Sequence, residues 1–189
     1  RFETLSVDDG LSQNSVYSIH QDKSGFMWFG TSNGLNRYDG ENIKVFKAKS
    51  PPLERANVNF VRGNLSEDKS GRIWYSNETG IYYFDPLKEE IIRAFDFMPG
   101  NSGAIYYYIT LALDDKENLW LSTSSNEILK FSIADKQLLS IPLPNEIDTT
   151  DYIQYGSKAG NELLLYLFKQ KRNLRFDLSS YKFEPVSTP

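Results

Sequence analysis

The sequence predicts an all-β fold, and three observations point to it. A tryptophan motif returns at a constant spacing, the segments around it are short and strand-like, and the turns between them contain Gly, Asp, Asn and Ser. Trp28, Trp74 and Trp120 are 46 residues apart (74 − 28 and 120 − 74). Four-stranded units repeated every ~40 to 50 residues are the signature of a β-propeller. We therefore predict about four blades of four strands each.

The whole chain, 1–189, is predicted to form one incomplete β-propeller domain. The repeat units are expected near residues 13–50, 58–98, 105–143 and 150–187. In the first unit the strands are expected at residues 16–21, 26–30, 35–38 and 43–47. A further strand is expected at residues 2–5. It is additional to the four strands of each of the four blades, so we interpret it as a closing strand of the propeller. No segment has a 3.6-residue periodicity, so almost no helix is expected.

The repeated motif combines an aspartate, a turn glycine and the tryptophan. Its members are Asp22, Gly25 and Trp28, then Asp68, Gly71 and Trp74, then Asp115 and Trp120. In the third copy, which is one residue shorter, Asn118 is expected to replace the glycine, because Asn also tolerates a positive φ. We interpret the tryptophans as packing wedges between blades and the aspartates as turn caps. Calcium binding is the less favoured alternative, because each motif offers one carboxylate.

The composition excludes several classes of function. The 189 residues contain no Cys and a single histidine, His20, which excludes thiol catalysis and a multi-histidine metal cluster. We interpret His20 as a structural residue, because acid–base catalysis needs a partner within hydrogen-bond reach. The net charge of −4 argues against nucleic-acid binding, and no apolar run is long enough to cross a bilayer. No metal or cofactor is expected.

The first repeat resembles the two-component regulator propeller repeat. The residues that carry the resemblance run from Asp9 to Ile19 and from Gln21 to Gly40. The match is dense over residues 5–46 and good over 61–95, fades in the third unit, and is weak in the fourth, which lacks the Trp.

The resemblance implies a fold and a role. Members of this family carry seven-bladed propellers outside the cytoplasmic membrane, followed by a membrane span and a histidine kinase. The chain would then be the N-terminal part of the periplasmic sensor region of a hybrid two-component system sensor histidine kinase. The family senses oligosaccharides and regulates glycan-utilisation genes. The resemblance implies no catalysis in this segment and no contact with the membrane.

The long loops on one face of the propeller are the predicted ligand site. Sugars present apolar C–H faces and hydroxyl rims, so aromatic rings beside Arg and Asn suit them. The candidate ligand-binding residues are Arg55, Asn57, Asn59, Arg62, Tyr106 and Tyr107. A structural role in strand packing or a salt bridge is the alternative for each of them.

Two other functions stay open at this point: a scaffold for protein partners and a propeller enzyme, either a lyase or a glycosidase. An incomplete ring leaves sheet faces and edges exposed, and such surfaces promote association. We therefore also predict that copies of the chain associate with one another.

Overall fold

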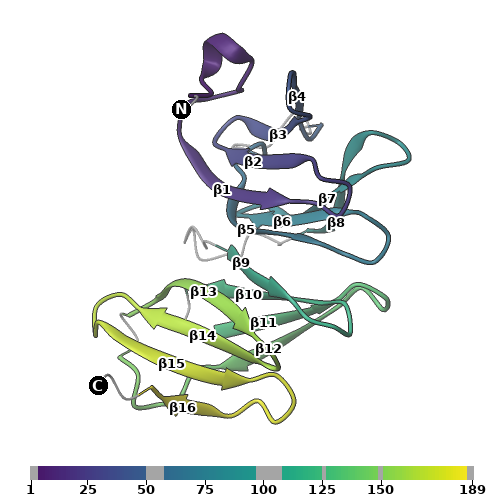
Figure 1. Ribbon diagram of the computed structural model, residues 1–189. Helices are drawn as coiled ribbons and strands as arrows, with labels where there is room; N and C mark the ends of the chain where they lie inside the picture. The colour runs from purple at the N-terminus through teal and green to yellow at the C-terminus, as the bar shows by residue number, and fades with distance from the viewer. Residues whose placement is uncertain (1–3, 50–57, 97–107, 125–126, 149–150, 187–189) are drawn as a thin grey trace. The chain divides into compact units, whose positions relative to one another are not determined.

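The computed structural model is an all-β protein, as the sequence predicts (Figure 1). It describes residues 4–49, 58–96, 108–124, 127–148 and 151–186. These residues form sixteen strands and one short 3-10 helix, η1 (Val7–Asp9), which Ser6 and Asp9 close with a capping box. Among the helices of the described residues, none is long and apolar enough to cross a membrane.

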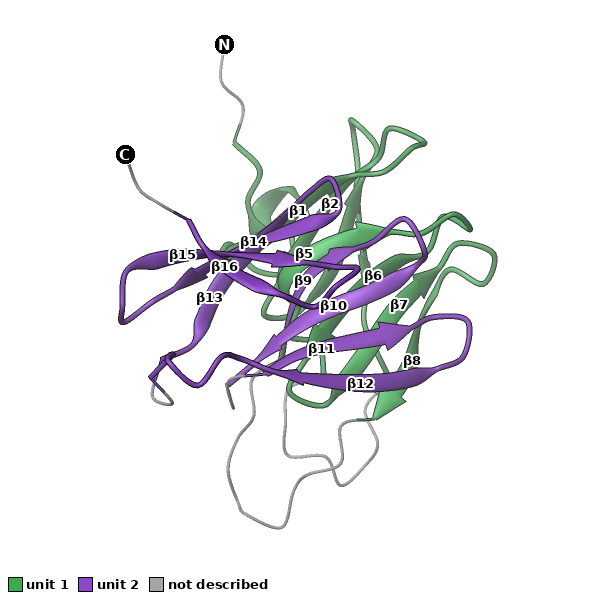
Figure 2. Cartoon of the chain, turned by 90° about the horizontal axis from the view of Figure 1, so that it is seen from below, with its two compact units in different colours: residues 1–103 green, residues 104–189 purple. Residues whose placement is uncertain are grey.

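The chain divides into two compact units, Arg1–Gly103 and Ala104–Pro189 (Figure 2). Each unit contains two four-stranded antiparallel sheets, in which consecutive strands are hydrogen-bonded neighbours. Short turns join the strands, as antiparallel neighbours require. The four sheets correspond to the four predicted repeat units.

Unit 1 contains the first and second sheets. The first sheet consists of β1 (Val16–Gln21), β2 (Met27–Thr31), β3 (Gly34–Tyr38) and β4 (Ile43–Phe46). The second consists of β5 (Arg62–Glu67), β6 (Ile73–Asn77), β7 (Gly80–Asp85) and β8 (Glu90–Asp96). Their core includes Trp28, Phe46 and Phe84, whose rings lie 4.5 to 5.9 Å apart between centroids. At such distances aromatic rings attract one another beyond their burial.

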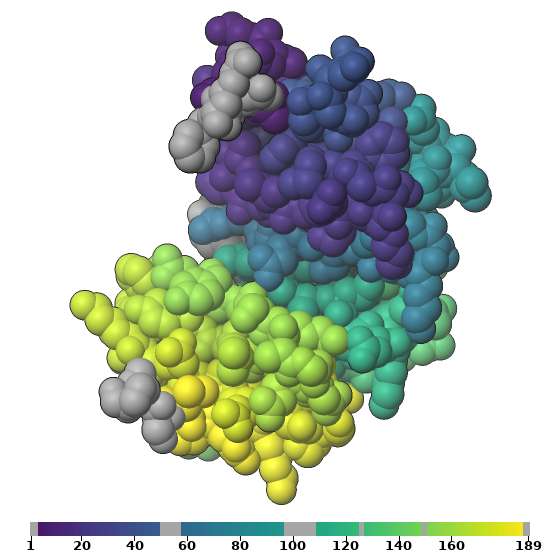
Figure 3. All heavy atoms as spheres, viewed as in Figure 1, coloured from purple at the N-terminus to yellow at the C-terminus, as the bar shows by residue number. Residues whose placement is uncertain are grey.

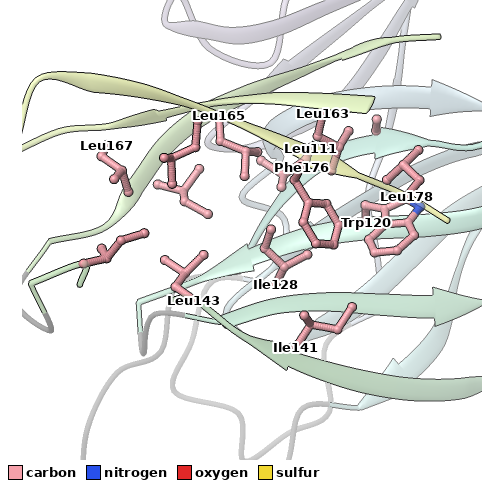
Figure 4. Close-up of a cluster of buried hydrophobic side chains, with 14 residues drawn as sticks. Leu111, Trp120, Ile128, Ile141, Leu143, Leu163, Leu165, Leu167, Phe176 and Leu178 are labelled. Atoms are coloured by element: carbon pink, nitrogen blue, oxygen red, sulfur yellow. The ribbon is translucent and has the colours of Figure 1, made fainter. Parts of the chain in front are cut away.

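Unit 2 contains the third and fourth sheets. The third sheet consists of β9 (Tyr108–Leu113), β10 (Asn118–Thr123), β11 (Glu127–Ser132) and β12 (Gln137–Pro142). The fourth consists of β13 (Ile153–Ala159), β14 (Glu162–Leu167), β15 (Arg172–Asp177) and β16 (Phe183–Pro185). Figure 3 shows side chains of the fourth sheet at the surface, in yellow-green and yellow. The opposite face of that sheet packs on the third sheet (Figure 4).

The core of unit 2 follows from the alternation of side chains along β14. Leu163, Leu165 and Leu167 are fully buried, whereas Leu164 between them is 39% exposed. Alternate residues of a strand point to opposite faces, so the three buried leucines share one face. That face meets Trp120 and its neighbours in the third sheet. The apolar run at residues 163–168 therefore has one buried face and one exposed face.

The predicted strand positions of the first unit are confirmed to within one residue at every end. The predicted closing strand at 2–5 is only partly within the described residues. Thr4 and Leu5 are described, and neither belongs to a strand. The segment that follows turns through η1, and Gly10 ends it with a φ of 107°, a left-handed conformation that favours glycine.

Candidate functional site

The tryptophan of each of the first three sheets donates a hydrogen bond to an aspartate six residues earlier. The Nε1–Oδ2 distances are 2.7 Å for Trp28 to Asp22, 2.7 Å for Trp74 to Asp68, and 2.9 Å for Trp120 to Asp114. The same carboxylates accept backbone N–H groups of the turn between the strands. Each aspartate therefore shapes the turn and also satisfies the buried indole N–H.

The third motif differs from its prediction. Asp114, rather than Asp115, is the aspartate that binds Trp120. Asp115 instead accepts a hydrogen bond from Lys158 Nζ at 2.8 Å, with its own side chain 91% exposed. The residue at the glycine position is also different: Glu117, with a φ of 61°, occupies it, and not Asn118. The motif is therefore not shortened, since Asp114 restores the six-residue spacing.

Hydrogen bonds set the ionisation of Asp114. Burial opposes the charged form, but the backbone and side-chain donors of Asn118, the indole of Trp120 and the N–H of Lys116 outweigh it, and the pKa of Asp114 is lowered. The carboxylate is therefore held in the charged form that accepts these bonds.

A cationic side chain also lies close to each of these tryptophan rings. Arg37 Cζ lies 5.8 Å from the centroid of Trp28, and Lys130 Nζ lies 5.8 Å from that of Trp120. These separations suit a cation–π interaction. The repeated tryptophans are thus occupied by packing, an acceptor and a cation, which supports their interpretation as structural residues.

His20 lies on β1, opposite Trp28 in the register. Its Nε2 is buried and has no hydrogen-bond partner. Burial lowers the pKa of His20, although the carboxylates of Glu67 and Asp22 act in the opposite direction. The imidazole is therefore kept neutral at physiological pH.

Four of the predicted ligand-binding residues, Arg55, Asn57, Tyr106 and Tyr107, lie outside the described residues. Asn59 and Arg62 are described. Asn59 Oδ1 accepts the N–H of Ala48 at 2.7 Å, so it links the segment before β5 to the end of β4. Arg62 is exposed at the start of β5. Both therefore stand at one end of the sheets of unit 1, and their role in binding stays a prediction.

The same end of unit 1 carries a polar cluster that the sequence gives no motif for. Asn77 Nδ2 donates to the carbonyl of Val58 at 3.0 Å, and Asn77 Oδ1 accepts the N–H and the hydroxyl of Thr79. The Thr79 hydroxyl also contacts the hydroxyl of Tyr82. These bonds join the turn between β6 and β7 to the segment that carries Asn59.

Arg93 of β8 completes this cluster. Its Nε donates to the hydroxyl of Tyr82 at 2.8 Å, its Nη1 to Asp96 at 2.6 Å, and its guanidinium lies 5.2 Å from the Tyr82 ring centroid. We call Asn59, Arg62, Thr79, Tyr82, Arg93 and Asp96 the unit 1 rim. It presents a guanidinium and a carboxylate at the loop end that the sequence predicted for a ligand, above the buried hydroxyl groups of Thr79 and Tyr82.

Two buried tyrosine rings lie beneath the exposed groups of the unit 1 rim. Tyr75 and Tyr82 stack with centroids 5.4 Å apart and planes 12° from parallel. Tyr75 is almost fully buried, and burial raises the pKa of its hydroxyl far above the ordinary value. Tyr75 therefore stays un-ionised and supports the ring of Tyr82, which holds the guanidinium of Arg93.

Unit 2 has a corresponding loop end, organised by Asp151. Its buried carboxylate accepts the N–H groups of Tyr152, Lys169 and Gln170 at 2.8 to 2.9 Å. It therefore ties the segment before β13 to the turn between β14 and β15. The rings of Tyr152 and Phe168 stack beside it, with centroids 5.2 Å apart.

The described residues can offer a ligand hydrogen bonds, charge and aromatic faces. Among them there is no group of three or more His, Cys, Asp or Glu side chains that could hold a metal ion. The exposed groups of the unit 1 rim include the guanidinium of Arg93 and the carboxylate of Asp96, which are able to hydrogen-bond a polar molecule.

Comparison with known proteins identifies the family to which the first repeat is similar. Residues 10–33 match the family model of the two component regulator propeller. Residues 10–33 carry this propeller repeat. A stretch of 46 residues is also 48% identical to histidine kinase P4 of Formosa agariphila, and it covers 24% of this chain and 3% of that protein. The resemblance on which the sequence prediction rested is confirmed.

Solved structures show the same propeller fold. The extracellular domain of a hybrid two component system from B. thetaiotaomicron aligns with a TM-score of 0.72 at 19% identity, over 98% of this chain and 26% of that one. A catalytically inactive virginiamycin B lyase from Staphylococcus aureus aligns with a TM-score of 0.71 at 13% identity, over 94% and 57%. The chain thus spans about a quarter of the first structure and little more than half of the second.

Proposed function

We propose that this chain is part of the extracytoplasmic, periplasmic ligand-sensing region of a two-component signalling protein, and that its ligand is an oligosaccharide. The observation that carries the proposal is the regulator propeller match at residues 10–33. It is supported by the histidine kinase relative and by the likeness to an extracellular two-component domain. The chain would supply recognition, and the catalysis would reside elsewhere in the protein.

The unit 1 rim suits a sugar in its chemistry. A saccharide needs donors and acceptors for its hydroxyl groups and an aromatic face for its C–H groups. Arg93 and Asp96 offer the first. The buried ring of Tyr82 lies 5.2 Å from the Arg93 guanidinium and supports it. Because hydrogen bonds among these residues fix their positions, binding would order few side chains. Arg62 and Asn59 extend the same end of the unit.

Signalling would follow from a shift between conformations. A ligand that binds one arrangement of the sensor better than another raises the population of that arrangement. In the complete protein that shift would bias the kinase and so regulate genes for glycan use. Kinase activity of the complete protein should then change with the same oligosaccharides that bind this chain.

The binding test uses a panel of oligosaccharides and thermal unfolding of the chain. An oligosaccharide at 100 times its Kd is expected to stabilise the chain by about 2.7 kcal/mol. Arg62→Ala and Arg93→Lys should each weaken binding at least several-fold, because an arginine hydrogen bond to the ligand is lost. Arg175→Ala is the matched control, since Arg175 pairs with Glu162 on the fourth sheet. If Arg175→Ala weakens binding as much as the rim variants do, the proposed site is wrong.

The same panel separates the alternative functions. Cleavage of an oligosaccharide during incubation would favour the alternative that the chain is part of an enzyme. The similarity to virginiamycin B lyase supports a shared fold and no shared activity. If no member of the panel binds, the proposed ligand is wrong and a protein-binding scaffold becomes the better description.

A further inference from the structure

Unit 2 carries two stacked aromatic rings at its loop end. Phe168 lies in the turn between β14 and β15, and Tyr152 lies directly before β13. The ring centroids are 5.2 Å apart with planes 24° from parallel, and the N–H of Phe168 donates to the carbonyl of Tyr152 at 3.1 Å. Phe168 is 44% exposed and Tyr152 is half-buried, so they present a flat apolar surface to solvent. We call Tyr152 and Phe168 the unit 2 aromatic pair.

The exposure of Phe168 comes from its place in a turn and does not depend on whether a further sheet follows. Phe168 is the first residue after the second strand of its sheet, and Ser32 and Ser124 hold that place in the first and third sheets. Each of those two sheets packs on the sheet that follows it. Even so, Ser32 is only half-buried and Ser124 is exposed. A residue at this position therefore stays open to solvent beside a packed neighbour.

Asp151 fixes the backbone on which the two rings are mounted. Its buried carboxylate accepts the N–H groups of Lys169 and Gln170 in the turn, and that of Tyr152 in the segment before β13. Because these bonds connect the two segments that carry the rings, the backbone of the aromatic pair is already ordered. A ligand that binds there loses less conformational entropy than one that must order a loose turn.

The polar side chains of the same turn are not engaged with the rest of the described chain. Among the residues that the structure describes, no hydrogen bond or ion pair involves the side chains of Lys169, Gln170 and Lys171. The turn thus offers an amide, which both donates and accepts, and two ammonium donors. The segment before β13 adds the exposed residues Glu146 and Asp148, so charges of both signs occur around the aromatic pair. Such surroundings suit a ligand that is rich in hydroxyl groups.

We propose that the unit 2 aromatic pair is a second carbohydrate-binding site, at which a sugar ring of an oligosaccharide stacks on Phe168. A pyranose has C–H groups that pack on an aromatic face and hydroxyl groups that bond to amide and ammonium groups. The site supplies both, with Gln170 as the central polar partner. The second site rests on the proposed function, because it takes the same class of ligand. It adds an exposed aromatic face that the unit 1 rim lacks, since Tyr82 there is buried.

The experiment titrates the chain with hexasaccharides of β-linked glucose, xylose, galactose and uronic acid, followed by NMR. The ring signal of Tyr152 reports the second site, and the backbone signals of Arg62 and Arg93 report the unit 1 rim.

Three variants test the stacking. Phe168→Leu removes the flat ring and keeps an apolar side chain, whereas Phe168→Tyr keeps the ring. Tyr155→Leu is the matched control, because Tyr155 is 57% exposed and stacks on Tyr166 within the strands of the same sheet. Circular dichroism and thermal unfolding of every variant verify that it is folded.

The Tyr152 signal of the wild type is expected to shift with at least one of these hexasaccharides. Phe168→Tyr should keep the Kd within about twofold and Phe168→Leu should raise it about tenfold, because only the ring offers a stacking face. Tyr155→Leu should leave the Kd unchanged.

The outcomes separate the second site from the proposed function. If the signals of the unit 1 rim respond and that of Tyr152 does not, the second site is wrong and the proposed function stands. If Phe168→Leu binds as the wild type does, or Tyr155→Leu weakens binding as much, the sugar does not stack on Phe168. If no signal responds to any hexasaccharide, both proposals are overturned.

Discussion

The pairing of Asp114 with Trp120 can be tested against its neighbour in the chain. We take Asp114→Ala as the perturbation and Asp115→Ala as its matched control. Asp114 accepts bonds from the N–H groups of Lys116 and Asn118, from Asn118 Nδ2 and from Trp120 Nε1, at 2.8 to 3.1 Å. Asp115 has a carboxylate that is 91% exposed and an ion pair with Lys158.

The expected magnitudes follow from burial. Trp120 is fully buried, so loss of its acceptor leaves an unpaired donor, which costs about 1 to 3 kcal/mol. Loss of the turn bonds adds about 1 kcal/mol, because water can replace part of them. We therefore expect Asp114→Ala to lower the free energy of unfolding by about 3 kcal/mol. An exposed ion pair contributes about 0 to 1 kcal/mol, which is the limit for Asp115→Ala.

The assay has two parts. Urea unfolding followed by far-UV circular dichroism gives the change in stability. Exchange of the Trp120 indole proton, followed by NMR, reports the bond itself and is expected to accelerate in Asp114→Ala only. Equal destabilisation by the two variants, or faster indole exchange in Asp115→Ala, would refute the assignment of Asp114.

Three further substitutions test single features. Burial holds the pKa of His20 in the folded protein below its value in the unfolded chain. Protonation therefore favours the unfolded chain, and the stability that is present above about pH 6.5 is lost as the pH falls below that value. His20→Gln should remove that part of the pH dependence of the urea midpoint. Gly30→Ala should destabilise by about 1 to 3 kcal/mol, since an added Cβ would lie 2.6 Å from Val61 Cγ1; unchanged thermal unfolding would contradict this. Glu117→Gly should raise stability by up to about 1 kcal/mol, because Glu117 has a φ of 61°; a lower urea midpoint would oppose it.

The sequence predicted the repeated parts of the fold well because repetition averages out local ambiguity. A second repeated feature is an aromatic residue on the third strand of each sheet: the residues at 38, 84, 131 and 176 occupy equivalent cross-strand positions. The third motif was misaligned for a local reason. Two consecutive aspartates precede Trp120, and Asn118 resembled the missing glycine, whereas Glu117 takes the left-handed conformation despite its side chain.

The unit 1 rim shows what a single sequence could not supply. Arg93, Tyr82 and Thr79 lie outside the repeated aspartate–glycine–tryptophan motif. Tyr82 and Arg93 are cross-strand partners because β7 pairs with β8 through an irregular register between Ile81 and Tyr82. Such a shift changes which side chains share a face, and residue type alone does not reveal it. Asn59, which was predicted from the sequence, lies at the end of the unit that carries this cluster, and its role in binding stays a prediction.

The fourth sheet explains why the aspartate and the tryptophan are lost together. The residue six places before Leu164 is Lys158, and the turn between β13 and β14 contains only Gly160 and Asn161 between the strands. A buried indole N–H without an acceptor is costly, and so is a buried carboxylate without donors. Neither residue is therefore stable there without the other. Leucine has no polar group to satisfy, so it fills the tryptophan position without the longer turn. The weak fourth repeat thus reflects a shorter turn between β13 and β14 of the fourth sheet.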